Sequence, residues 1–190
     1  MTSTRDKCNE AGYFLAQMKT AINNKDAFRY NLSAFISALR STTLFMKKEY
    51  AHTPKFSSWY PTKQAQMEAD KILSFFNKQR VLTIHIKSIA THSQVQFHSP
   101  SIDLAKFTGE PLSFTVTASV EESGKPTMQV FNIVDPAGAL AGEASIETQW
   151  LFDDLPQEDN PDNKDVFVLC AEQLDKIAAI VSECEQMFTN

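Results

Sequence analysis

The chain has 190 residues, of which 43% are hydrophobic and 22% are charged, with only five glycines and eight prolines. This length and composition are typical of one globular domain, and they exclude a disordered or fibrous chain. No apolar run is long enough to cross a bilayer, and the amino terminus does not resemble a signal peptide. The three cysteines are expected to be reduced. We therefore expect a cytoplasmic protein with no membrane contact.

Charge is divided unevenly along the chain. Residues 1–90 contain 14 Lys and Arg against 6 Asp and Glu, whereas residues 91–190 contain 4 against 17. The amino half can therefore attract a polyanion. Its basic residues are scattered rather than clustered, so an alternative stays open in which the two halves neutralise each other within the fold or across a dimer.

Three helices are predicted in the amino half. Apolar residues recur at steps of three and four over residues 5–22 and again over residues 26–50, which indicates two amphipathic helices. The segment AHTPKFSSWYP, residues 51–61, has two prolines and no period, so we predict a connection there. A third helix is predicted over residues 62–89, with a bend near residues 77–80.

The hydrophobic period changes from helical to two after residue 92. In residues 112–120 apolar side chains alternate with Ser and Thr, as in a strand with one face on a core and the other in water. A turn at residues 123–126 predicts a hairpin with a second strand over residues 127–134. Further strands are predicted over residues 145–152 and, as a short fourth, over residues 95–98.

An acidic, proline-broken loop is predicted over residues 153–165, followed by a last helix over about 165–188 with an unbroken apolar stripe. The sequence therefore predicts a single α+β domain over residues 1–190. Its core is an up-and-down bundle of about four long helices. An antiparallel β-hairpin or meander, residues about 93–152, is inserted before the C-terminal helix.

The familiar fingerprints of cofactor and metal sites are missing from the sequence. It contains no glycine-rich phosphate loop, no paired CxxC, no HExxH and no GxSxG. His85, His92 and His98 follow one another at seven- and six-residue intervals, but no carboxylate lies at ligand spacing between them. We therefore expect no metal and no cofactor.

The segment RVLTIH, residues 80–85, contains a pair of residues suited to cleaving RNA. An imidazole such as His85 can exchange the proton of a ribose 2′-hydroxyl or of the leaving oxygen. The planar guanidinium of Arg80 can hold a phosphate bidentately and stabilise the charge that develops on it. Five residues turn an ideal helix by about 500°, which leaves the two side chains about 140° apart. Their convergence requires a bend or a dimer interface.

Together with the preceding helix, which reads AFISALRSTTLF, the Arg-x4-His spacing of this segment resembles the HEPN superfamily of helical bundles. The resemblance covers residues 5–89 and the closing helix, and leaves the β insertion unexplained. It implies a metal-independent endoribonuclease that acts on RNA as a homodimer. Arg80 and His85 would then be its catalytic residues.

The segment FSSWY, residues 56–60, places aromatic rings near lysines, which is a pattern that can stack RNA bases. Trp59, Tyr60 and Lys63 are the candidate RNA-binding residues. Alternatives stay open for both sites, because aromatic rings beside prolines often join the core and an Arg and a His often pair with protein groups. If these alternatives hold, the protein is non-catalytic and is either an interaction protein built on a helical bundle or a small-ligand binder.

Overall fold

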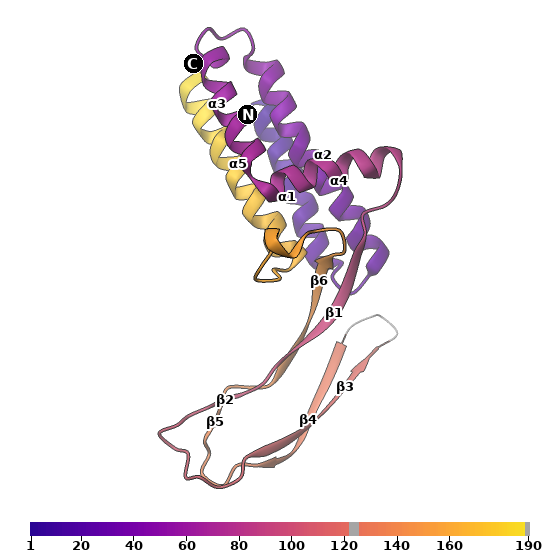
Figure 1. The fold of residues 1–190 in the computed structure, drawn as a ribbon, viewed down its shortest axis with the longest axis vertical. Helices are drawn as coiled ribbons and strands as arrows, with labels where there is room; N and C mark the ends of the chain where they lie inside the picture. The colour runs from indigo at the N-terminus through magenta and orange to yellow at the C-terminus, as the bar shows by residue number, and fades with distance from the viewer. Residues whose placement is uncertain (122–125, 189–190) are drawn as a thin grey trace. The chain divides into compact units, whose positions relative to one another are not determined.

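The computed structural model describes residues 1–121 and 126–188 and has the α+β architecture expected from the sequence (Figure 1). The helices are α1 (Ser3–Thr20), α2 (Lys25–Tyr50), α3 (Phe56–Ala69), α4 (Lys71–His85) and α5 (Val166–Phe188). The strands are β1 (Thr91–His98), β2 (Ser101–Ile102), β3 (Ser113–Val120), β4 (Pro126–Val134), β5 (Leu140–Ala141) and β6 (Ser145–Phe152). Among the described residues, no helix is both long enough and apolar enough to span a membrane.

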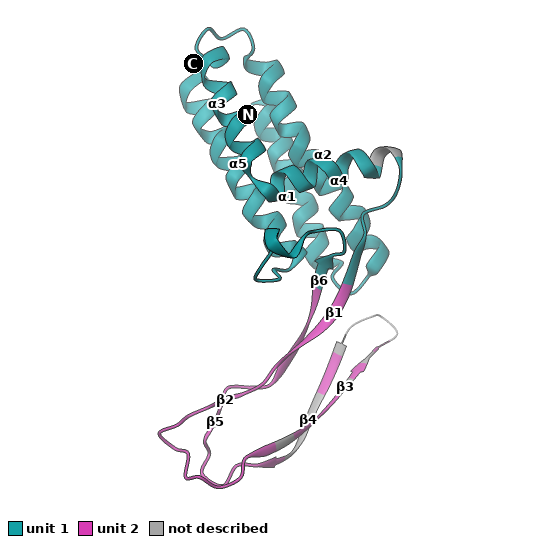
Figure 2. Ribbon diagram, in the orientation of Figure 1, with its two compact units in different colours: residues 1–92, 150–190 teal, residues 93–149 magenta. Residues whose placement is uncertain are grey.

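The chain divides into two compact units (Figure 2). The first, here called the helical unit, consists of Met1–His92 and Trp150–Asn190. The second, here called the β unit, consists of Ser93–Gln149. The chain therefore leaves the helical unit after β1 has begun and returns to it near the end of β6.

The core of the helical unit forms where the apolar stripes of its helices meet. Phe28, Leu32 and Phe35 of α2 are almost completely buried, as the helical spacing predicts. Trp150 of β6 also belongs to this core. Its ring stacks on that of Phe28 with centroids 4.4 Å apart, and its Nε1 donates to the carbonyl oxygen of Ile22 at 2.8 Å. The indole is therefore buried with its one donor satisfied.

Ion pairs inside the helical unit explain the uneven charge of the sequence. Basic residues from the amino half pair with acidic residues from the last 41 residues of the chain. The pairs are Arg5 with Glu185, Lys63 with Glu183, Lys71 with Asp159 and Lys87 with Asp154. These four pairs join the two halves of the chain within this unit, as one of the alternatives that the sequence left open expects.

The third predicted helix is in fact two helices, and the predicted connection before it is largely helical. Asp70 has an extended backbone (φ −76°, ψ 114°), and its carboxylate accepts from the backbone N–H groups of Ile72 and Leu73 at 3.0 Å, so it caps a new helix. In the preceding segment Phe56 and Tyr60 are buried, and their packing keeps α3 helical in spite of Pro61.

The strands pair two by two, in the order β1–β6, β2–β5 and β3–β4. The β3–β4 pair is antiparallel, with Thr117 opposite Gln129, and an irregularity near Ser113 and Thr115 shifts the register. These strands match the predicted hairpin, while the predicted fourth strand is the second half of the longer β1. Residues 123–125 of the predicted turn lie outside the described residues.

Few of the described side chains of the β unit are buried. Among its described side chains only Ala139 is buried. Large apolar side chains that are 43–80% exposed are Val95, Phe97, Ile102, Leu104, Phe107, Ile133 and Val134. These described apolar side chains therefore lie on the surface of the β unit.

Candidate functional site

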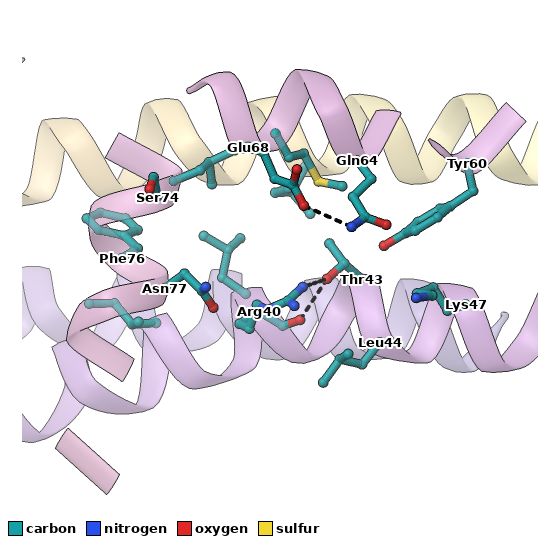
Figure 3. Close-up of a pocket in the computed structure, with 15 residues that line it drawn as sticks. Arg40, Thr43, Leu44, Lys47, Tyr60, Gln64, Glu68, Ser74, Phe76 and Asn77 are labelled. Carbon is teal, nitrogen blue, oxygen red and sulfur yellow. Dashed lines mark hydrogen bonds between the residues drawn. The ribbon is translucent and has the colours of Figure 1, made fainter. Parts of the chain in front are cut away.

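A cavity of about 220 Å³ lies among helices α2, α3 and α4 of the helical unit (Figure 3). Each helix supplies residues at steps of three or four, as one face of a helix does, and α5 adds a single residue. The lining comprises Ile36, Leu39, Arg40, Thr43, Leu44, Lys47, Tyr60, Gln64, Met67, Glu68, Leu73, Ser74, Phe76, Asn77 and Ile177.

The floor of the cavity is apolar and continuous with the core. Ile36, Leu39, Phe76 and Ile177 are each at most 3% exposed. Phe76 meets Phe35 edge to face with ring centroids 6.3 Å apart, which fixes the orientation of its ring. The floor is therefore a preformed surface on which an apolar group can lie.

The wall formed by α2 carries two cations beside this floor. The Arg40 Nη1 donates to the Thr43 hydroxyl oxygen at 2.5 Å, and that hydroxyl donates to the Arg40 carbonyl oxygen at 3.0 Å. The Lys47 ammonium lies 5.5 Å from the centroid of the Tyr60 ring. Thr43 thus holds the Arg40 guanidinium along the wall, and Tyr60 gives Lys47 a cation–π contact.

Tyr60 points its hydroxyl into the cavity (Figure 3). Burial raises the pKa of this phenol, although a hydrogen bond with Thr43 and the charge of Arg40 both oppose that change. The hydroxyl is therefore protonated at neutral pH and adds an uncharged polar group to the cavity wall.

The opposite wall, formed by α3, carries one carboxylate. The Gln64 amide donates to the Glu68 carboxylate at 2.8 Å, one helical turn apart (Figure 3). Within residues 1–121 and 126–188 this carboxylate lies beyond ion-pair distance of Arg40 and Lys47, and no other Asp or Glu forms an ion pair with either cation. The cavity therefore contains two cations and one anion that are not joined to each other.

The predicted catalytic residues belong to the last two turns of α4, and Arg80 is not among the residues that line the cavity. Arg80 is partly buried, and its Nε has no hydrogen-bond partner among the described residues. His85 is the last residue of α4, and its side chain lies outside what the structure describes. Whether the two groups converge on one space is not tested, so their catalytic role stays a prediction.

The predicted RNA-binding residues take part in helix packing. The Trp59 Nε1 donates to Glu183 at 2.8 Å, and the Lys63 ammonium lies 2.7 Å from the same carboxylate. The hydrogen bond with Lys63 and, to a smaller extent, the one with Trp59 lower the pKa of the Glu183 carboxylate. Tyr60 is 5% exposed and is the one residue of the three that lines the cavity. RNA binding by these residues stays a prediction.

The two histidines near the β strands each contact a different carboxylate. The His92 Nδ1 lies 2.5 Å from Asp153, and the His98 Nε2 lies 3.0 Å from Glu147. No three His, Cys, Asp or Glu side chains among the described residues are grouped as metal ligands would be.

Sequence reasoning missed Arg40, Lys47, Gln64 and Glu68. A signal was present on α2, where polar residues at positions 40, 43 and 47 follow the helical period directly beside the apolar stripe. The pattern on one helix did not reveal that two other helices leave a cavity opposite these residues.

These features define a class: an α+β protein with a cavity among three helices of a bundle and a β insertion before the last helix. Residues 3–143 match the family model described as bacteriophage lambda protein ea47. Because the match covers more than half of the chain, this protein belongs to that family. No curated protein and no solved structure matches the chain.

The expected membership of the HEPN superfamily is therefore wrong. The family that matches covers α1–α4 and most of the β unit, including the segment that the HEPN resemblance left unexplained. The Arg-x4-His pattern misled because it constrains only two positions. In a chain with four Arg and four His, a match to the Arg-x4-6-His motif of the superfamily arises by chance in roughly one case in four. Membership of the ea47 family identifies no reaction.

Proposed function

We propose that this protein is a non-catalytic small-ligand binder whose ligand occupies the cavity among α2, α3 and α4. The observation that carries the proposal is the combination of a preformed apolar floor with a few polar groups on the surrounding walls. Sites of this build hold small organic molecules, because apolar burial supplies affinity and the few polar groups set the orientation.

The size of the cavity limits the ligand. About 220 Å³ is below the range for drug-sized pockets, so the cavity encloses about two fused rings, and a third ring of a larger ligand lies in its opening. If such a ligand buries about 150 Å² of apolar surface, the gross gain is about 4 kcal/mol before the cost of immobilising it. That gain corresponds to a Kd of about 1 mM at best, so a probe must bury more apolar surface than this to bind at micromolar concentration.

An uncharged fluorescent naphthylamine, N-phenyl-1-naphthylamine, tests this proposal. Its emission rises on transfer from water to an apolar site, and a saturable rise is expected with the wild-type chain. Leu44→Trp should weaken binding at least about tenfold, because Leu44 lines the cavity, is 44% exposed and can carry a larger ring into the opening without repacking the core.

Phe45→Trp is the matched control for this experiment. Phe45 is the next residue of α2, is 41% exposed and does not line the cavity, so the same new side chain should leave probe binding unchanged. Equal binding by Leu44→Trp and Phe45→Trp, or no saturable binding by the wild type, would refute the proposal.

A second candidate function is homodimerisation through the β unit. It is favoured by the seven exposed large apolar residues of that unit, because apolar side chains that are exposed in one copy can be covered by a second. Sedimentation of the wild type should give the mass of a dimer, and a chain with Ile102→Thr, Leu104→Ser and Ile133→Thr should give that of a monomer. A wild-type chain that is monomeric at about 100 μM would exclude it.

A further inference from the structure

The charges around the cavity indicate which kind of ligand it takes, an inference that rests on the proposed function. Arg40 and Lys47 lie on the α2 wall and Glu68 lies on the α3 wall, so the lining has one net positive charge. Within the described part of the chain neither cation forms an ion pair with a carboxylate. We propose that the ligand is a small organic anion, with its charged group bound by Arg40 and Lys47 and its apolar body lying on the cavity floor.

Arg40 is the principal anion-binding residue. A guanidinium has five N–H donors, and among the described residues the one hydrogen bond of this group is to Thr43. Because Thr43 holds one edge of the group, the remaining donors are oriented in advance and can bind a carboxylate, phosphate or sulfonate through two oxygens. Lys47, about two turns further along the same helix, adds a second positive charge from a more exposed position.

The apolar floor of the cavity favours an organic anion over a simple inorganic ion. Leu39 and Phe76 form a surface that a phosphate ion would leave uncovered, whereas an aromatic or aliphatic body would cover it. An anion with such a body gains from the charge and from apolar burial together, so it should bind more tightly than inorganic phosphate and more tightly than its uncharged analogue.

Removing the charge of Glu68 should change anion affinity in the direction opposite to removing the charge of Arg40. Its carboxylate faces the same space as Arg40 and repels an incoming anion (Figure 3). Glu68→Gln keeps the size and the polar character of the side chain and removes the charge, so an anion should bind more tightly to this variant.

The experiment compares two probes that differ by one charge, 8-anilinonaphthalene-1-sulfonate and the uncharged N-phenyl-1-naphthylamine, on the full chain. The sulfonate should bind the wild type more tightly. Arg40→Met should raise its Kd about tenfold and Lys47→Met about threefold, since Lys47 is more exposed. Glu68→Gln should lower its Kd about threefold. Any change that these variants make to the shape of the cavity acts on both probes, so the readout is the ratio of the sulfonate Kd to the Kd of the uncharged probe, which should rise for Arg40→Met and Lys47→Met and fall for Glu68→Gln.

Two further variants keep the result interpretable. Lys48→Met removes an exposed lysine of α2 that does not line the cavity, and it should change neither Kd. Arg40→Lys keeps a positive charge and should retain more sulfonate binding than Arg40→Met, which separates loss of charge from loss of folding. Circular dichroism confirms the helical content of each variant.

The outcomes separate this inference from the proposed function. If both probes bind with equal Kd and Arg40→Met changes neither, the anion assignment is wrong while small-ligand binding stands. If Glu68→Gln weakens sulfonate binding, the anion assignment is wrong as well. If neither probe binds the wild-type chain in a saturable way, both the anion assignment and the proposed function fail.

Discussion

The first turn of α1 is held by a carboxylate from another helix. Glu49 of α2 accepts from the Thr4 hydroxyl at 2.6 Å, from the Thr4 backbone N–H at 2.8 Å and from the Ser3 N–H at 3.0 Å. Thr4 is completely buried. Glu49 therefore supplies acceptors for helix-terminal N–H groups that have no partner within α1.

These bonds make the contribution of Glu49 to stability dependent on pH. Burial tends to raise the pKa of Glu49, but the bonds from Thr4 and Ser3 outweigh it, and the pKa lies below its usual value of 4.5. A carboxylate with a lowered pKa stabilises the fold above its unfolded-state pKa, and that stabilisation is lost as the pH falls through the folded-state pKa.

Glu49→Gln should therefore lower the free energy of unfolding by about 1–2 kcal/mol at pH 7. The difference from wild type should shrink below about pH 4.5, where the wild-type carboxylate itself becomes protonated. Urea denaturation at pH 7, 5 and 3.5 measures it. A difference that is the same at all three values would show that the charge of Glu49 is not what stabilises α1.

Gln173 of α5 presents the opposite case, a buried polar group that is not satisfied. It is 0% exposed, and neither of its amide atoms has a hydrogen-bond partner among the described residues. Gln173→Met, which keeps the volume and removes the polar atoms, should raise the free energy of unfolding by about 1 kcal/mol. A variant less stable than wild type in urea would show that the amide does have a partner.

Among the elements, α4 depends on one residue at its start. Asp70 caps α4 and also forms an ion pair with Lys176 of α5. Burial tends to raise the pKa of Asp70, but Lys176 and the bonds from Leu73 and Ile72 hold it below its usual value. One side chain thus both begins a helix and joins it to another.

Two substitutions of Asp70 separate these roles. Asp70→Asn keeps an acceptor for the helix cap and loses the ion pair, so it should cost about 0.5 kcal/mol. Asp70→Ala loses both and should cost about 1–2 kcal/mol. Thermal unfolding by circular dichroism ranks the two, with Lys176→Met as the control that removes the ion pair alone. Equal losses for Asn and Ala would show that the cap contributes nothing.

Asp70 also shows why the sequence predicted some elements well and others poorly. The stripes of α2 and α5 are long, so their period predicted both helices and their burial. In residues 51–89 the apolar pattern is shorter, and Pro61 suggested a connection where buried Phe56 and Tyr60 maintain a helix. A capping aspartate within a continuing pattern does not by itself indicate that one helix ends and another begins.

The candidate site was still less predictable than the elements. Its residues come from three helices, and their proximity depends on how those helices pack, which the spacing within one helix does not determine. Of the lining residues only Tyr60 was singled out from the sequence, and for a different role. Local patterns predict which face of a helix is buried; they do not predict where neighbouring faces leave a space.

For the molecule as a whole, the division into two units has an experimental consequence. Every residue of the hydrophobic core cluster lies in the helical unit. The Asp153 N–H donates to the Ala90 carbonyl oxygen at 3.1 Å, so the two points where the chain leaves and re-enters that unit are close together. The helical unit should therefore fold without residues 93–149.

Replacement of residues 93–149 by a short Gly-Ser link tests this expectation. The shortened chain should keep its helical circular dichroism, a cooperative unfolding transition and N-phenyl-1-naphthylamine binding, because the cavity is lined by the helical unit alone. The midpoint of its thermal unfolding should lie within about 5 °C of that of the wild type. Loss of cooperative unfolding would mean that the β unit stabilises the helices directly.

The contact between Arg5 and Glu185 also has a consequence for the order in which the protein folds during translation. The Arg5 guanidinium lies 2.5 Å from the Glu185 carboxylate, and the Thr2 hydroxyl donates to the same carboxylate at 2.6 Å. On the ribosome α1 to α4 emerge well before the helix that completes their packing, and the whole β unit is synthesised in between. The apolar surface of α1 to α4 that packs against α5 therefore stays exposed until α5 leaves the exit tunnel.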